Sequence, residues 1–355
     1  MPGSGFIGAC FAIPGDLASR TGGYAYARAV LAEMPLEGWQ LDHLELPASF
    51  PQPDAAALAA TSRAFKGVPG DRLLFVDGLA FGSFPDWLLE EQRGRWLALV
   101  HHPLALETGL SPECAAALKE SETRALACSE AVVAASPETA RELICSYGVP
   151  EEKLVVAQPG TVLPDAAGEG GGERPCLLTV GTISPRKGQD VLVKALAQVT
   201  DLSWRCRLIG SDRREPEAVA VLRDLIIELG LSARVEIAGE VAPEALAPAY
   251  READIFVLPS YYEGYGMAFA EAMAYGLPIV ACPTGAVSET VPAEAALFVP
   301  PGSPNALAAA LRRLLSDKAL RSEKAAAAWR HGRNLPTWHE TASKIVRAFE
   351  RVPAR

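Results

Sequence analysis

The chain has 355 residues, 49% of them hydrophobic and 21% charged, which is typical of a soluble globular protein with room for two domains. No apolar run approaches the ~18–20 residues of a membrane span, so we expect no integral membrane segment. The 43 Asp and Glu outnumber the 33 Lys and Arg, and the resulting net charge of −10 argues against a nucleic-acid partner.

The cysteines and the start of the chain bear on its location. The seven cysteines are scattered and odd in number, and none forms a C-x-x-C pair. We therefore expect reduced thiols, no metal site and a cytoplasmic protein. The first residues, MPGSGFIGACFAIPGD, have no basic region before their apolar run, so they are interpreted as a first strand and not as a signal peptide.

Apolar runs alternate with amphipathic stretches in the first half of the chain. Strands are predicted at 6–13, 40–46, 73–76, 96–100, 131–134 and 154–156, and helices at 24–33, 55–64, 112–128 and 137–147. Strands that alternate with helices favour a parallel sheet. The first half is therefore predicted to be a doubly wound, Rossmann-like domain.

Two loops of this half lie where ligands bind in such sheets. The loop PGDLASRTGGY (14–24) follows the first strand, and Gly22 and Gly23 would let the backbone approach a ligand closely. This loop is not G-x-G-x-x-G, which argues against dinucleotide binding. The sequence VHHPLALE (100–107) places His101 at the carboxyl end of the fourth strand, at the edge where ligands bind in a doubly wound sheet.

A Gly-rich segment predicts the domain boundary. Residues 165–174, DAAGEGGGER, contain few apolar side chains, and the strand–helix alternation restarts after them. We predict an N-terminal domain over 1–165, a linker over 166–174 and a second domain over 175–336. In the second domain, strands are predicted at 176–180, 204–209 and 235–238, with helices from Gln189 and over 218–229. The tail from 337 onward has the pattern of an amphipathic helix.

The segment from Ala253 to Pro283, ADIFVLPSYYEGYGMAFAEAMAYGLPIVACP, is the most informative part of the chain. It predicts a strand, a Gly-rich loop with Glu263, an apolar helix with Glu271 inside it, and a second strand. Gly276 is placed to end the helix. A buried carboxylate at Glu271 would need partners, and a helix that begins near Gly266 would favour a phosphate at its N-terminus. These features together suit a sugar nucleotide.

This segment resembles the nucleotide-sugar motif of retaining family 4 glycosyltransferases, which have the GT-B architecture. The family pattern is P-S-x-x-E-G-x-G-x-x-x-x-E-A-x-x-x-G-x-P-[IV]-[IV]-A, and the chain has PSYYEGYGMAFAEAMAYGLPIVA. The resemblance implies that Glu263 lies beside the donor hexose and that Glu271 binds the ribose. It also implies that the backbone amides of the loop meet the diphosphate; the loop residues concerned are Gly264, Tyr265, Gly266 and Met267.

Other segments match the same family. In VGTISPRKG (180–188), the resemblance assigns Lys187, with Arg186 beside it, to the diphosphate. Many members have Arg where this chain has Thr182, so we expect Arg186 to compensate. In the first half, the resemblance places His101 in the active site. It also places Gly22 and Gly23 near the donor phosphates, and it suggests an acceptor site formed by Tyr24, His102 and Glu107.

The resemblance implies a GT-B fold with two Rossmann-like domains that face a central cleft, the C-terminal helix (337–355) crossing back onto the first domain. The expected reaction moves a hexosyl group from a nucleotide-diphosphate sugar to an acceptor with retention. The leaving diphosphate takes the acceptor proton, and no metal or other cofactor is expected. The catalytic residues would be His101, Lys187, Arg186 and Glu263. A nucleotide-sugar epimerase on the same fold and a catalytically silent binding domain remain alternatives.

The distribution of charge favours a soluble acceptor. Residues 1–165 hold 21 Asp and Glu against 11 Lys and Arg, a balance of −10, while the remainder is neutral. Docking on anionic lipid is helped by clustered basic residues, each contributing about 1 kcal/mol, and the basic residues of the first half are scattered. We therefore expect a small-molecule or saccharide acceptor, and an amine group on it would be attracted by an acidic domain. A lipid-linked acceptor is the alternative.

Overall fold

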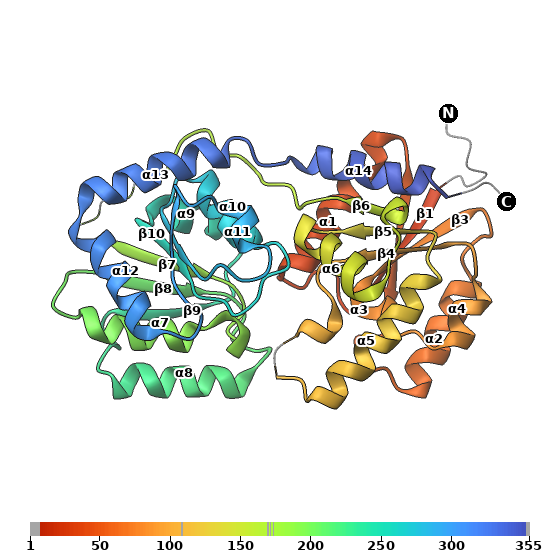
Figure 1. The fold of residues 1–355 in the computed structure, drawn as a ribbon, viewed down its shortest axis with the longest axis horizontal. Coiled ribbons are helices and arrows are strands. Elements are labelled where there is room, and N and C mark those ends of the chain that lie inside the picture. Colours follow the sequence, from red (N-terminus) through yellow and green to blue (C-terminus); the bar gives the residue numbers. More distant parts are fainter. Residues whose placement is uncertain (1–7, 108, 169, 171, 173, 353–355) are drawn as a thin grey trace. The chain divides into compact units, whose positions relative to one another are not determined.

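A computed structural model describes residues 8–107, 109–168, 170, 172 and 174–352. The chain divides into two compact units (Figure 1). The N-terminal unit runs to Gly160 and includes the chain from Pro336 onward, and the C-terminal unit is Thr161–Leu335. The unit boundary thus lies a few residues before the predicted one. Gly168 and Gly170 of the predicted linker donate their N–H groups to the carbonyls of Tyr275 and Arg251, within the C-terminal unit, and residues 169, 171 and 173 lie outside the described part.

The N-terminal unit contains a six-stranded parallel sheet in the order β2-β1-β3-β4-β5-β6. Its strands are β1 (Gly8–Pro14), β2 (Gln40–Leu46), β3 (Arg72–Asp77), β4 (Trp96–Val100), β5 (Ala131–Ala134) and β6 (Leu154–Val156). Its α-helices are α1 (Gly22–Glu33), α2 (Ala55–Lys66), α3 (Gly78–Phe81), α4 (Asp86–Glu91), α5 (Pro112–Ala127), α6 (Pro137–Tyr147) and α14 (Trp338–Glu350). The predicted bounds are confirmed for β2, β4, β5 and β6, whereas β1 ends one residue later than predicted and β3 is one residue longer at each end. Residues 6 and 7 of the first predicted strand lie outside the described part.

Helix α14 supplies part of the core of the N-terminal unit. Ala342, Ile345 and Phe349 are buried in the same apolar cluster as β1, β3 and β4, and the Phe349 ring contacts the edge of Trp39 at 5.1 Å. The helix begins with a capping box, in which Thr337 and Glu340 bond each other's backbone N–H groups. Its apolar stripe therefore completes one face of the first sheet.

The C-terminal unit contains a second six-stranded parallel sheet, in the order β12-β11-β10-β7-β8-β9. Its strands are β7 (Cys176–Val180), β8 (Arg205–Ile209), β9 (Val235–Gly239), β10 (Ile255–Leu258), β11 (Ile279–Ala281) and β12 (Ala296–Phe298). Its α-helices are α7 (Gln189–Leu196), α8 (Pro216–Glu228), α9 (Pro243–Glu252), α10 (Met267–Ala274), α11 (Val287–Thr290), α12 (Pro304–Ser316) and α13 (Lys318–Gly332). Both units thus have the predicted doubly wound architecture.

Each sheet has a point at which the chain changes its direction of travel across the strands. In the N-terminal unit this point lies between β1 and β3, and in the C-terminal unit between β7 and β10. Loops that leave the carboxyl ends of these two neighbouring strands diverge to opposite faces of the sheet, and the space left between them is where ligands bind in open α/β folds. The strand orders therefore predict ligand binding at the loops after β1 and β3 in the N-terminal unit and at the loops after β7 and β10 in the C-terminal unit.

One buried carboxyl lies outside these loops. Glu122 of α5 is 1% exposed, and its Oε2 accepts a hydrogen bond from the Leu104 N–H at 2.9 Å. Burial raises the pKa of Glu122 to about 8, although the hydrogen bonds from Leu104 and Tyr147 act in the opposite direction. At neutral pH the side chain is therefore a neutral acid in the folded protein.

We expect a Glu122→Gln variant to gain stability relative to the native chain as the pH rises. In the unfolded chain Glu ionises near its ordinary pKa of about 4.3. Between that value and about 8 the folded state retains a proton that the unfolded state releases, so the free energy of unfolding of the native chain falls with pH. Glutamine does not titrate, so the difference in Tm should grow across this window and then level off. Parallel Tm curves, or the same trend for the exposed Glu120→Gln control, would contradict the prediction.

Candidate active site

The loops after β7 and β10 bring Lys187 and Glu263 into contact. Lys187 ends a 3-10 turn (Pro185–Lys187) after β7, and Glu263 lies in the loop after β10, the neighbouring strand. The Lys187 Nζ donates to Glu263 Oε1 at 2.6 Å, and the two side chains are only 14% and 7% exposed. Arg186 Nη1 lies 3.8 Å from Glu263 Oε2 and donates to the Tyr262 carbonyl at 2.8 Å. Two cations and one carboxylate therefore form a compact cluster at the switch point of the sheet.

The charge state of Glu263 follows from these neighbours. Burial opposes ionisation, but the charges of Lys187 and Arg186 outweigh it and hold the pKa of Glu263 below its ordinary value. Ser260 Oγ also donates to Glu263 Oε1 at 2.6 Å. The backbone behind the carboxylate is closely packed, since a Cβ at Gly285 would lie 2.2 Å from the Glu263 carbonyl oxygen. Glu263 is thus an ionised carboxylate held in one position.

Helix α10 begins directly after this cluster. Gly266, the N-cap, has φ +89°, and a Cβ there would lie 2.7 Å from the Phe269 ring. Only glycine fits this left-handed, crowded position. The Gly266 carbonyl is the first acceptor of the helix and takes the N–H of Phe269, so the amides of Met267 and Ala268 have no acceptor within the helix and this end carries partial positive charge. Gly276 follows the helix in the left-handed region and donates to the Met273 carbonyl at 2.9 Å, as expected for a helix end.

The second carboxylate of the motif has one strong partner. Tyr250 of α9 donates its hydroxyl hydrogen to Glu271 Oε2 at 2.7 Å, and its ring stacks on Tyr275 with centroids 5.5 Å apart. Burial raises the pKa of Glu271, and the bond from Tyr250 acts against this rise. Glu271 therefore retains one carboxylate oxygen, Oε1, that is suited to accept hydrogen bonds from a ligand.

The N-terminal unit brings another predicted set of residues together. Gly22 and Gly23 begin α1, and a Cβ on Gly23 would lie 3.6 Å from His101 Nε2. Tyr24 lies in the same turn and donates its hydroxyl hydrogen to the Pro14 carbonyl at 2.6 Å. The absence of a side chain at Gly23 therefore leaves the imidazole of His101 close to the backbone of the first turn of α1.

The two histidines after β4 have different surroundings. His101 is in edge contact with the ring of Tyr26 at 5.1 Å between centroids, and its carbonyl accepts from Thr139 Oγ1 at 3.3 Å. His102 Nε2 lies 3.3 Å from Glu107 Oε2, and both side chains are partly exposed. His101 is thus built into the sheet edge, whereas His102 and Glu107 form a pair on the loop that follows.

Sequence reasoning missed three residues that contact the predicted ones. Ser260 bonds Glu263 and lies three residues before it, within the same motif. Tyr250 bonds Glu271 from α9, a helix that was not predicted and that contains an internal proline, Pro248. Asp77 ends β3, and its Oδ2 lies 3.5 Å from His101 Nε2. Only Ser260 had a local signal, because the other two contacts join distant parts of the chain.

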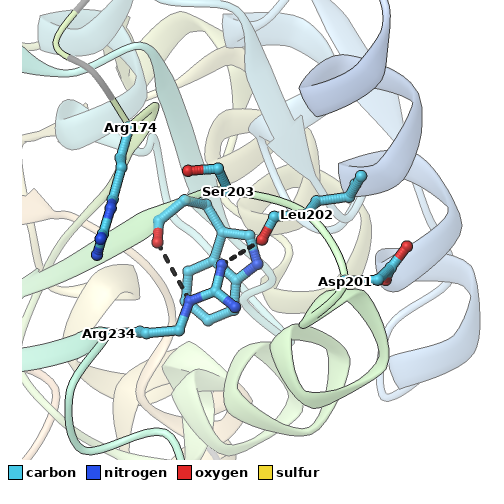
Figure 2. A pocket seen from close by; sticks show the side chains of 6 residues that line it. Arg174, Asp201, Leu202, Ser203 and Arg234 are labelled. Atoms are coloured by element: carbon cyan, nitrogen blue, oxygen red, sulfur yellow. Dashed lines mark hydrogen bonds between the residues drawn. The ribbon is translucent and has the colours of Figure 1, made fainter.

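A shallow pocket of about 390 Å³ in the C-terminal unit contains none of the predicted residues (Figure 2). Its lining includes Trp204 and Arg234, whose guanidinium lies 3.7 Å from the centre of the Trp204 ring. Arg234 also donates to the carbonyls of Thr200, Leu202 and Trp204, which closes the turn after α7; the bond to Leu202 is drawn in Figure 2. The arginine therefore has a structural role at this pocket.

Two further properties concern only the described residues. No three His, Cys, Asp or Glu side chains in this part of the chain gather in a way that could hold a metal ion. Among the helices of the described ranges, none is long and apolar enough to cross a membrane. All seven cysteines are free thiols.

Sequence comparisons place the chain among glycosyltransferases. A family described as "Glycosyl transferases group 1" matches residues 174–317. The chain is 32% identical to the D-inositol 3-phosphate glycosyltransferase of Kineococcus radiotolerans, over 75% of this chain and 68% of that protein. It is 30% identical to the protein of the same name from Rhodococcus erythropolis, over 91% of this chain and 76% of the relative. The match to the Rhodococcus opacus protein, at 32% identity, spans 64% of that relative's length.

Solved structures share the fold. A sucrose-phosphate synthase from Thermosynechococcus elongatus superimposes with a TM-score of 0.81 at 24% identity, covering 97% of this chain and 98% of that one. Anabaena HepE, solved in complex with UDP-glucose, has a TM-score of 0.73 at 18% identity, with 96% and 99% coverage. At these identities the likeness shows the architecture.

Proposed function

Because this chain belongs to the glycosyl transferases group 1 family and is a glycosyltransferase with the GT-B fold, we propose that it transfers a hexosyl group from a nucleotide-diphosphate sugar to an acceptor. The proposed acceptor is a soluble small molecule or saccharide, and the anomeric configuration of the hexose is retained. The observation that carries the proposal is the Lys187–Glu263 contact of 2.6 Å at the switch point, directly before the N-terminus of α10. Cations and helix amides at this place suit a diphosphate.

In the proposed reaction the acceptor hydroxyl attacks the anomeric carbon on the face from which the diphosphate leaves. The bond between the anomeric carbon and the phosphate oxygen breaks, a glycosidic bond forms, and the hydroxyl proton passes to the departing diphosphate. No protein nucleophile is required. Lys187, Arg186 and the first amides of α10 would stabilise the charge that develops on the leaving group. A bound metal ion is not needed for this step, because two fixed cations already lie at the site.

The carboxylates would orient the donor. Glu263 is ionised and buried, so it would accept hydrogen bonds from hexose hydroxyls. Its bond to Lys187 keeps it beside the diphosphate site, so the sugar and phosphate positions are coupled through one ion pair. Glu271, held by Tyr250, would accept from the ribose hydroxyls. The amides of Gly264, Tyr265, Gly266 and Met267 would face the diphosphate.

Residues of the N-terminal unit would also take part in the reaction. We propose that His101 contacts substrate, that Gly22 and Gly23 let α1 approach the donor phosphates, and that the acceptor is held by groups including Tyr24, His102 and Glu107.

Several relatives are named D-inositol 3-phosphate glycosyltransferase, which makes a cyclic polyol phosphate the first acceptor to test. Neutral and amino sugars are the other acceptors, since the N-terminal half is acidic. The free cysteines support a cytoplasmic location.

The donor can be identified by thermal shift with UDP-, GDP- and ADP-sugars. A ligand at about 100 times its Kd stabilises the folded protein by about 2.7 kcal/mol. UDP-glucose is the first donor to try, because solved neighbours are complexes with UDP or UDP-glucose. The stabilising donor is then incubated with each acceptor, and NMR of the product reports the anomeric configuration. Inversion would refute retention, an isomerised donor without acceptor would indicate an epimerase, and binding without turnover would indicate a silent binding domain.

A lipid-linked acceptor is tested separately. We expect little sedimentation of the protein with anionic liposomes at low salt, because the balance of −10 in residues 1–165 opposes binding to a negative surface. Neutral liposomes serve as the control. Strong binding that salt abolishes would show that the scattered basic residues gather on one face, and it would make a lipid-linked acceptor the better proposal.

A further inference from the structure

Asp77 lies where the ends of β3 and β4 meet, in the N-terminal unit. In the parallel register Asp77 is opposite Leu99, so the chain of β4 passes it and reaches His101 two residues later. The strand ends are held close together here, since a Cβ at Gly78 would lie 2.8 Å from the Leu99 carbonyl oxygen. The result is a distance of 3.5 Å between Asp77 Oδ2 and His101 Nε2.

The two oxygens of Asp77 have separate partners. Oδ1 accepts from the Leu79 N–H at 2.9 Å and so caps the short helix α3. Oδ2 faces the imidazole. The Asp77 side chain is 11% exposed, so water screens its charge poorly. Since the cap occupies only one oxygen, capping alone does not explain why the second is directed toward a histidine.

The histidine nitrogen that faces Asp77 is enclosed. His101 Nε2 is buried and makes no hydrogen bond in the described part of the chain, so its 3.5 Å approach to Asp77 Oδ2 is an ion-pair contact. The His101 side chain is nevertheless 24% exposed, so its exposed part belongs to other ring atoms. Gly23 and the ring of Tyr26 lie against the imidazole and carry no charge at pH 7. Asp77 therefore brings a negative charge next to this nitrogen.

We propose that Asp77 is a positioning residue for His101: its carboxylate holds the proton of the imidazole on Nε2, so Nδ1 is the nitrogen that accepts a hydrogen bond from a substrate hydroxyl. A carboxylate accepts hydrogen bonds and repels a nitrogen lone pair, so a carboxylate 3.5 Å away favours the tautomer with the proton on the facing nitrogen. The proposal rests on the proposed function for its substrate, whereas the Asp77–His101 pairing itself is a property of the free protein.

The pairing is tested with Asp77→Asn, which keeps the size and the capping ability of the side chain and removes its charge. The control is Asp54→Asn, which changes another N-cap of the same unit, one whose carboxylate accepts from the Ala57 N–H at 2.7 Å. Long-range ¹H–¹⁵N spectra of the five histidines, assigned with a His101→Ala variant, report which ring nitrogen of His101 is protonated. We expect Nε2–H in the native protein and in Asp54→Asn, and a shifted tautomer population in Asp77→Asn. An unchanged population would overturn the proposal.

The consequence for catalysis is tested by a double-mutant cycle. An acid–base side chain such as the one proposed for His101 contributes about 10²–10⁴-fold to the rate. Part of this effect would depend on Asp77, so Asp77→Asn should lower kcat about tenfold or more and leave the donor KM unchanged. In a His101→Ala background the same change should have no further effect. An equal loss of kcat in both backgrounds would show that Asp77 does not act through His101. If no donor is turned over at all, the proposed function fails, and the spectra still decide the pairing.

Discussion

Replacing Lys187 with alanine should lower kcat by about 10²–10³-fold, the effect of removing one fixed group that stabilises transition-state charge. The Lys187 ammonium lies in contact with Glu263 and beside Arg186, so its loss leaves one cation to neutralise both the carboxylate and the departing diphosphate. Activity of the native protein should persist in EDTA. The measurement is steady-state turnover of the donor found by thermal shift, with and without chelator.

Loss of stability has to be separated from loss of catalysis in this variant. Removing one partner of a buried ion pair costs about 3–5 kcal/mol, because the other charge remains buried and poorly compensated. The double variant Lys187→Ala with Glu263→Gln removes that orphan charge, so its Tm should recover while its kcat stays low. Lys194→Ala, which breaks an exposed pair with Asp190 in the same region, is the matched control. Recovery of kcat together with Tm, or a metal-dependent enzyme that tolerates Lys187→Ala, would refute the proposed role.

The two glutamates of the motif should differ in what they bind. Glu271→Gln removes a charged hydrogen-bond acceptor for the ribose. Hydrogen bonds to charged groups contribute about 1.5–3 kcal/mol. The affinities for the free nucleoside diphosphate and for the sugar nucleotide should therefore both fall about 10–100-fold. Glu263→Gln should leave the affinity for the free nucleotide intact and lower sugar transfer. Calorimetry with nucleoside diphosphate distinguishes them, and equal losses in both variants would contradict this division.

The ribose contact should also depend on pH. Burial raises the pKa of Glu271, and hydroxyl donors prefer the ionised carboxylate, so nucleotide affinity should be lost as the pH falls through this raised pKa. Glu263 should contribute no such dependence over the same range, because neighbouring cations hold its pKa low. In Glu271→Gln the affinity should be lower and should change less with pH. A native protein with pH-independent affinity down to the ordinary pKa of Glu would show that Glu271 does not contact the nucleotide as an anion.

Much of the fold could be predicted from the chain alone because the signals are local. Short apolar runs predicted the strands of both sheets other than β12, with small errors at their ends, and β4, β5, β6 and β7 have the predicted bounds. The motif around Glu263 and Glu271 is contiguous, so its strand, loop and helix could be placed without knowledge of the rest of the chain. Helices α3 and α4 were missed because four and six residues are too few for a 3.6-residue period to be seen.

What the chain alone could not provide is which of these residues touch each other. Lys187 and Glu263 are 76 positions apart and meet only because β7 and β10 are neighbours at the switch point. Tyr250 reaches Glu271 from a helix whose pattern is interrupted by Pro248, and Asp77 reaches His101 because β3 and β4 pair in parallel register. Local sequence motifs identify which residues form the site, whereas the ion pairs and pKa values of these residues depend on contacts across strands. Those contacts arise only when the sheets form, since a side chain's electrostatic environment depends on spatial neighbours and not on sequence neighbours.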